Sequence, residues 1–79
     1  LEPLSTRERM GRVLDQLHGG DGFVSFAAFF TASEGRAGVV VTFLAIMELI
    51  KESLIDIVQA EPFAPIHIRA KIAGAEEGQ

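Results

Sequence analysis

The segment 39–51 limits what this chain can fold into more than any other part of the sequence. It reads Val-Val-Val-Thr-Phe-Leu-Ala-Ile-Met-Glu-Leu-Ile-Lys. At 100° per residue one continuous apolar stripe, predicted to face the core, contains Ile46, Val39, Ile50, Phe43, Met47 and Val40. Leu44, Val41 and Leu49 lie outside this stripe or at its margins. A small monomer does not normally expose this many apolar side chains as one patch, so we expect some of them to contact a partner. The alternative is that all of it is core.

Length and composition predict one small soluble domain. The chain has 79 residues, is 48% hydrophobic and 23% charged, and has a mean hydropathy of +0.29. The absence of cysteine excludes disulfides and cysteine-bound zinc and suits a reducing cytoplasm. The uncharged run 37–47 is too short to cross a bilayer, and no segment resembles a signal peptide. We therefore expect a cytoplasmic protein without a membrane partner.

The ends of the chain are predicted to lie outside the fold. The sequence does not begin with methionine, which favours a domain from a longer protein. Residues 1–4 are expected to be disordered or left over from cloning. Residues 5–72 are expected to form the domain, and the polar residues 73–79 a flexible tail.

Local signals place the first helices. Ser5-Thr6-Arg7-Glu8 has the form of a capping box, so a helix is predicted from there to just before Gly19. Phe23-Val24 is predicted to be a very short strand. Ser25 is predicted to cap a brief second helix over 26–30, and Thr31 to Glu34 repeats the capping signal ahead of a long helix that ends near Glu52.

Alternation predicts a hairpin at the end of the domain. Ile55, Ile57 and Gln59 alternate with other residues, and Ile66, Ile68 and Ala70 do the same after a loop that contains two prolines. With the short strand as a third member, the order of elements predicts an α+β winged helix domain. Three helices pack on a small antiparallel sheet, and the β-hairpin loop forms the wing.

A winged helix suggests DNA binding, but the third helix lacks the side chains for it. Between Val39 and Ile50 there is no Arg, Lys, Asn or Gln, and the formal net charge is -4. We expect no direct nucleic-acid contact. The alternative function, a nucleic-acid-binding winged helix resembling transcription regulators, would have to use cations elsewhere: Arg7, Arg9, Arg12, Arg69 and Lys71.

Catalytic motifs are missing. His18 and His67 are far apart in sequence and have no metal-ligand spacing, and the serines sit at predicted caps and turns. The sequence predicts no enzyme, no cofactor and no metal.

The predicted wing and last strand offer two further contacts. Phe63 stands between Pro62 and Pro65, and either projects from the wing or folds back onto the helices. If the strand 66–71 lies at the sheet edge, its free backbone groups could pair with a partner strand.

Residues 39–51 together with 59–63 resemble the C-terminal region of the bacterial kleisin, segregation and condensation protein A. Residues 5–10 and 24–26 add to the resemblance, which covers about 5–69. It implies a domain that docks on the head of an SMC ATPase, on the face away from the coiled coil, and organises chromosomes within that complex, near the nucleoid. The accessory segregation and condensation protein B would bind parts of the kleisin absent from this chain.

Two departures from the family pattern concern turns. Ser53 stands where glycine is common after the long helix, which predicts a less sharply turned helix end. Pro62-Phe63-Ala64-Pro65 replaces a frequent Pro-Phe-Gly-Asp, which predicts a stiffer wing. Because Val40, Leu44 and Met47 share one edge of the helix, we expect docking through that edge; self-association through it is a third possibility. The predicted contact residues are Val40, Phe43, Leu44, Met47, Phe63, Ile66 and Ile68.

Overall fold

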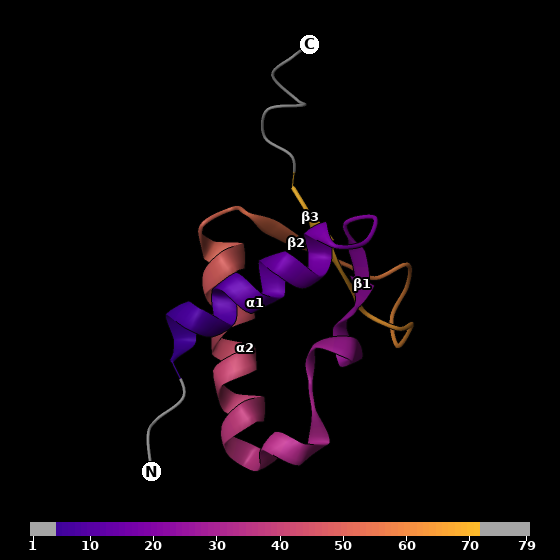
Figure 1. Ribbon diagram of the computed structural model, residues 1–79. Coiled ribbons are helices and arrows are strands. Elements are labelled where there is room, and N and C mark those ends of the chain that lie inside the picture. Colours follow the sequence, from indigo (N-terminus) through magenta and orange to yellow (C-terminus); the bar gives the residue numbers. More distant parts are fainter. Residues whose placement is uncertain (1–4, 72–79) are drawn as a thin grey trace.

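The computed structural model describes residues 5–71. Its elements are, in order, α1 (Thr6–His18), β1 (Phe23–Ser25), the 3₁₀ helices η1 (Phe26–Phe29) and η2 (Ala32–Glu34), α2 (Gly35–Lys51), β2 (Ile55–Val58) and β3 (His67–Ala70). In Figure 1 α1 lies across α2, and the small sheet stands at one end of the pair. The fold is therefore α+β, as predicted. The predictions for residues 1–4 and for the tail 73–79, and the predicted domain end at residue 72, lie outside the described residues.

Helix α1 forms as its sequence pattern predicts. Ser5 is the N-cap, and its Oγ accepts a hydrogen bond from the Glu8 N–H at 3.2 Å. The helix ends at His18, immediately before the glycine pair. Val13 and Leu17, one turn apart, are buried in the core, so one face of this helix packs on the rest of the domain.

The brief helix predicted over 26–30 is found as a 3₁₀ helix over 26–29, so the described chain has two α-helices and the predicted set of three is not confirmed. Residues 26–29 form a 3₁₀ turn that ends at Phe30 in an extended conformation, and the Ser25 side chain makes no cap hydrogen bond. Thr31 does not cap by its side chain either. A segment this short and rich in phenylalanine gains too little from propagation to sustain an α-helix.

The buried face of α2 differs from the predicted stripe. The buried residues are Gly38, Val41, Thr42, Ala45, Ile46 and Leu49. Of the predicted stripe only Ile46 is buried; Ile50 is half-buried, and the other four members are exposed. The helix is apolar nearly all round, so hydrophobicity could not choose a face. Small residues such as Gly38 and Ala45 chose it, because they let other elements approach closely.

The sheet has the order β1-β3-β2, with both pairings antiparallel. The hairpin and the joining third strand are thus confirmed. The condition for pairing a partner strand with the last strand is not met, since β3 is the central strand and its backbone pairs on both sides. Ile68 sits in the middle of β3, opposite Val24 and Ile57, and is 0% exposed.

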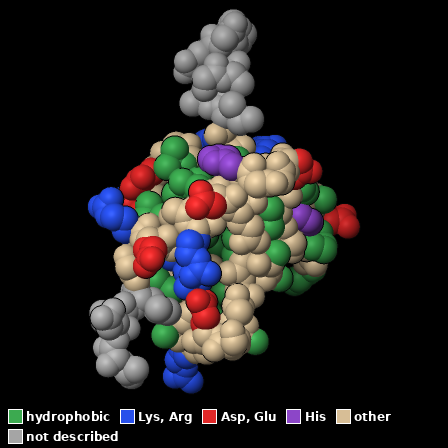
Figure 2. Space-filling view, in the orientation of Figure 1, with side chains coloured by type: hydrophobic (Ala, Val, Ile, Leu, Met, Phe, Trp, Pro, Cys, Tyr) green, Lys and Arg blue, Asp and Glu red, His purple; other side chains and the backbone are tan. Residues whose placement is uncertain are grey.

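One core joins the helices and the sheet. It consists of Val13, Leu17, Phe29, Ile46, Leu49, Ile55 and Ile68. In Figure 2 acidic and basic side chains are scattered over the visible face among apolar and uncharged groups. No helix among residues 5–71 is both long and apolar enough to cross a membrane.

The turn after α2 is sharp, contrary to the expectation from Ser53. The Leu54 N–H donates to the Leu49 carbonyl and the Ser53 N–H to the Ile50 carbonyl, each at 2.9 Å. These two hydrogen bonds together form a Schellman motif, in which the residue at the turn takes the left-handed conformation. Ser53 does so, with φ 64°. The fold therefore imposes on serine a turn that favours glycine.

Candidate functional site

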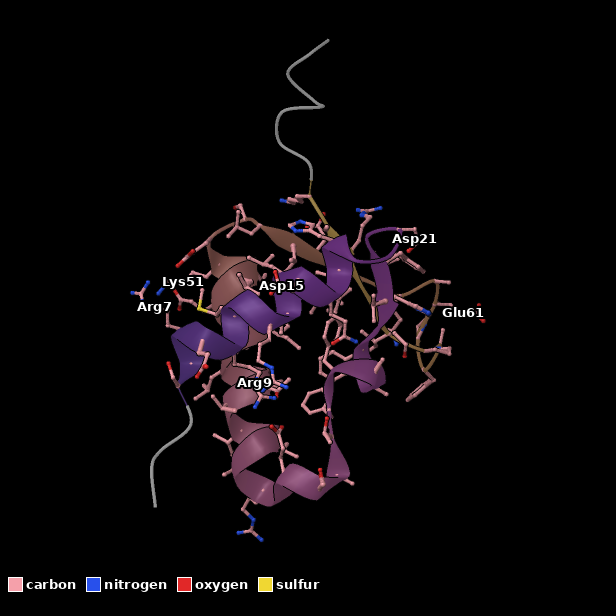
Figure 3. All side chains as sticks on the ribbon, viewed as in Figure 1. Arg7, Arg9, Asp15, Asp21, Lys51 and Glu61 are labelled. Atoms are coloured by element: carbon pink, nitrogen blue, oxygen red, sulfur yellow. The ribbon has the colours of Figure 1, made fainter. Side chains whose placement is uncertain are left out.

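An ion pair between the buried Arg9 and the partly exposed Glu34 fixes the start of α2 against α1. Arg9 Nη1 donates to Glu34 Oε1 at 2.8 Å and to Thr42 Oγ1 at 3.1 Å, while Arg9 Nη2 donates to Glu34 Oε2 at 2.7 Å. Figure 3 shows Arg9 reaching from α1 toward the beginning of α2. Both hydrogen bonds to the carboxylate are charge-assisted, and the paired fork holds one relative orientation of the two elements.

The ion pair shifts the pKa values of both Arg9 and Glu34. The hydrogen bond from Arg9, with the positive charges of Arg9 and Arg12, lowers the pKa of Glu34 against the opposing effect of desolvation. The hydrogen bond to Glu34 raises the pKa of Arg9 further above its already high value. Both groups are therefore charged across the physiological range.

Two glycines make room for this junction. Gly38 lies under the Glu34 side chain, and a Cβ at position 38 would stand 2.7 Å from Glu34 Oε1 and closer still to Glu34 Cβ. Gly35, between η2 and α2, has φ 69° and ψ -160°, a region almost confined to glycine. The sequence around 35–38 thus serves the placement of α2.

The face of α2 that points away from the core is apolar. Val39, Val40, Phe43, Leu44 and Met47 are between 47 and 50% exposed. At 100° per residue, Val40 and Met47 lie opposite the middle of the buried face, where a surface helix ordinarily carries charged or polar groups. Within this stretch the helix gains little stability from its outward side chains.

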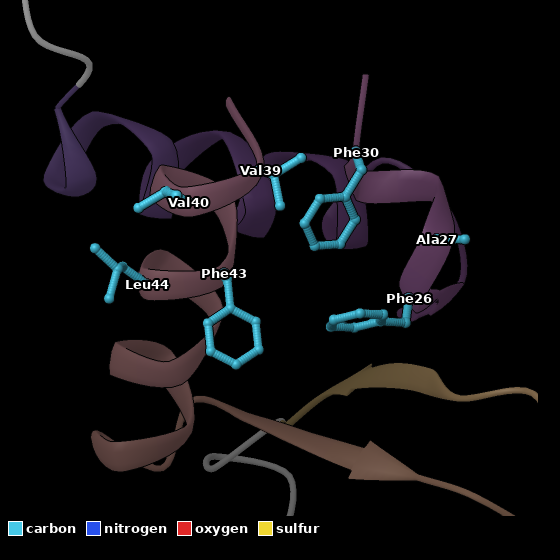
Figure 4. Close-up of a pocket in the computed structure, with 7 residues that line it drawn as sticks. All are labelled: Phe26, Ala27, Phe30, Val39, Val40, Phe43 and Leu44. Atoms are coloured by element: carbon cyan, nitrogen blue, oxygen red, sulfur yellow. The ribbon is translucent and has the colours of Figure 1, made fainter. Parts of the chain in front are cut away.

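This face forms one wall of an open apolar groove, shown in Figure 4. The other wall is the corner at η1, and the volume of the groove is about 660 Å³. Its lining residues are Phe26, Ala27, Phe30, Val39, Val40, Phe43 and Leu44. In Figure 4 the rings of Phe26 and Phe30 point across the opening toward α2. The lining contains no charged or polar side chain.

The corner wall is held in place from both sides. Phe29 is buried in the core, whereas the rings of Phe26 and Phe30 pack on each other with centroids 5.0 Å apart. The Phe26 N–H donates to the Ile66 carbonyl at 2.8 Å and so ties the corner to the chain that enters β3. The groove is therefore a built feature of the fold.

The connection from β2 to β3, the predicted wing, is a largely exposed loop. The Ala64 N–H donates to the Glu61 carbonyl at 3.0 Å, which closes a turn with Pro62 and Phe63 at its centre. Phe63 has φ 70° and is 100% exposed. The alternative in which its ring folds back onto the helices is therefore wrong.

Among the predicted contact residues, three line the groove: Val40, Phe43 and Leu44. Met47 is exposed on the same face of α2, and Ile66 is 36% exposed at the base of the wing. The assignment of Ile68 is corrected, because this side chain is fully enclosed in the core and reaches no surface.

Sequence reasoning missed half of the groove. The sequence assigned Phe26 and Phe30 to a brief helix without a contact role, and it placed Val39 on the face toward the core. The available signal was the crowding of three phenylalanines into residues 26–30. A domain of this size has room in its core for few of them, and only Phe29 is buried.

The cations that the nucleic-acid alternative requires are largely paired with acids. Arg9 is buried on Glu34. Arg69 and Lys71 both approach the Asp56 carboxylate, at 3.3 and 3.5 Å. Their charge is thereby offset, which weakens the attraction to phosphate that such binding needs.

The two histidines remain apart from any cluster of ligands. The His67 ring stacks on Phe23, with centroids 4.5 Å apart and planes 7° from parallel. Within residues 5–71 no three His, Asp or Glu side chains are grouped so that they could hold a metal ion.

These features describe a small α+β domain with an open apolar groove beside its second helix. The family model for segregation and condensation protein ScpA matches residues 2–71, and the chain belongs to this family. It is 60% identical over 70 residues to segregation and condensation protein A of Coxiella burnetii (strain RSA 493 / Nine Mile phase I), covering 89% of this chain and 26% of that protein.

More distant relatives carry the same name. The chain is 56% identical over 69 residues to the protein of Xylella fastidiosa (strain Temecula1 / ATCC 700964), which covers 87% of this chain and 22% of the relative. With the protein of Lactiplantibacillus plantarum the identity is 37% over 67 residues, with 85% and 26% covered. The chain thus spans about a quarter of the length of these curated relatives.

Proposed function

We propose that this chain is the C-terminal winged helix domain of a bacterial kleisin and docks on the head of an SMC ATPase. It acts there in chromosome segregation and condensation, in the cytoplasm and near the nucleoid. In this proposal the 3₁₀ helices take the place of the middle helix, and the β2–β3 connection is the wing. The chain supplies a structural contact and no chemistry of its own. Segregation and condensation protein B binds elsewhere on the whole kleisin.

The single observation that carries the proposal is the apolar outward face of α2. Five large side chains there remain about half exposed, and four of them line a groove without any polar side chain. Completing the burial of each would contribute about 1 kcal/mol, half the value for a whole side chain. Apolar contacts of this kind, concentrated in a few residues, are typical of protein interfaces.

Charge supports a protein partner over nucleic acid. The chain has a formal net charge of -4, and four of the five cations named for the alternative form ion pairs with carboxylates. Between Val39 and Ile50, α2 carries no Arg, Lys, Asn or Gln, and the Thr42 hydroxyl is buried, so no side chain there can reach a base edge or a phosphate as a donor.

The test compares two half-exposed leucines. Leu44 lines the groove and is 49% exposed, whereas Leu54 follows α2, does not line the groove and is 42% exposed. We expect Leu44→Glu to abolish binding to a purified SMC head in a calorimetric titration, because a carboxylate would be buried without a partner. Circular dichroism and the melting temperature should change little.

Leu54→Glu is the matched control and should bind like the original chain. Equal loss of binding in both variants, or unfolding of Leu44→Glu, would contradict the proposal. Sedimentation of the isolated chain separates docking from self-association: a dimer that Leu44→Glu dissociates would assign the face to a second copy.

A further inference from the structure

Two non-glycine residues of the described chain have positive φ, Ser53 at 64° and Phe63 at 70°. This conformation is unfavourable for a side chain with a Cβ, and most of all for a bulky one. At Ser53 the fold explains it, because the Schellman turn directs the chain from α2 into β2. At Phe63 the fold offers no such reason, since a ring that is 100% exposed contributes no burial.

The turn that holds Phe63 is well defined. Proline at position 62 cannot take positive φ, so the turn is of type II, which favours glycine at the place of Phe63. The Gln59 Nε2 donates to the Ala64 carbonyl at 2.8 Å and braces the turn across the wing. The backbone that carries the ring is therefore held in one conformation, which reduces the backbone ordering that binding would require.

The chemistry of the wing selects a protein partner. Among residues 59–66 there is one charged side chain, Glu61, and no Lys or Arg. An anionic lipid surface or a nucleic acid would repel that carboxylate and find no cation. An apolar pocket in a folded protein fits a rigid aromatic side chain with a bare apolar surround.

The wing is also continuous with the groove. Its last residue, Ile66, accepts the hydrogen bond from the Phe26 N–H, and Phe26 lines the groove. One partner surface can thus meet both. We propose that Phe63 is a pre-formed aromatic anchor that enters an apolar pocket on the same protein as the α2 face; this rests on the proposed docking to an SMC head.

The experiment separates binding from folding by replacing Phe63 with glycine. Phe63→Gly removes the ring and suits the left-handed turn, so the melting temperature should stay equal or rise by a few degrees. Affinity for the purified SMC head, measured by calorimetry with the 79-residue chain, should fall about tenfold or more. Phe63→Asn, which also tolerates this conformation, should weaken binding in the same way.

Ser53→Gly is the matched control, because it relieves the other left-handed residue and keeps the ring. It should raise the melting temperature and leave affinity unchanged. If the original chain binds the head and Phe63→Gly binds equally well, the anchor is overturned while the docking proposal stands. If the original chain does not bind the head, both are overturned.

A lipid arm completes the test. Sedimentation with vesicles of phosphatidylglycerol and phosphatidylethanolamine should recover neither the original chain nor Phe63→Gly. Binding of the original chain that Phe63→Gly abolishes would assign the ring to a lipid surface and overturn the anchor.

Discussion

Helices α1 and α2 reach the same core by different sequence rules. In α1 charged residues separate the apolar ones, and Val13 and Leu17 are buried where that pattern predicts. In α2 nearly every position is apolar, and the buried face is marked by Gly38, Thr42 and Ala45. The comparison teaches that on an all-apolar helix, size and hydrogen bonding decide which side is inside. The other side keeps large apolar side chains that the fold leaves about half exposed.

The largest effect on stability should appear when a buried and an exposed residue of α2 are each replaced by alanine. Ile46→Ala empties a fully enclosed site and should lower the free energy of unfolding by about 2–5 kcal/mol. Met47→Ala, one residue along and 47% exposed, should cost less than about 1 kcal/mol. Urea unfolding of both variants measures the difference. Equal losses would mean that the outward face is part of the core.

A smaller effect is expected where helix propensity and packing oppose each other. Gly38→Ala improves intrinsic helix propensity by about 1 kcal/mol, but its Cβ meets Glu34. Displacing Glu34 from Arg9 should outweigh that gain, for a net loss of about 1–3 kcal/mol. The control is Ala37→Gly, which removes a methyl from an exposed position of the same helix. A stabilised Gly38→Ala would show that the close approach is dispensable.

The smallest effect should appear in acid. Because the pKa of Glu34 is lower in the folded chain than its ordinary value of 4.5, the carboxylate stabilises the fold above that value. The contribution is lost as pH falls through the lower, folded pKa. Melting temperatures between about pH 7 and pH 3 should therefore drop more steeply for the original chain than for Glu34→Gln. If the melting temperatures of the two proteins fall equally with pH, the ion pair does not contribute to the placement of α2.

The sequence by itself determined the elements whose signals are local. Ser5 and the glycines after His18 set the bounds of α1, and alternation over 55–59 and 66–70 gave the two paired strands. The surplus of apolar side chains near 39–51 also identified three groove residues, Val40, Phe43 and Leu44. Caps, turns and periods act within a few residues, so they can be read without the rest of the molecule.

Only the tertiary structure decided the choices that depend on contacts between distant segments. The order β1-β3-β2 put Ile68 at the centre of the sheet, and the pairing of Arg9 with Glu34 and Thr42 turned α2 so that its small residues face inward. The turn closed by Glu61 and Ala64 held Phe63 outside. Several apolar faces were equally suited to burial by hydrophobicity alone, and the partners that selected among them lie far away in the sequence.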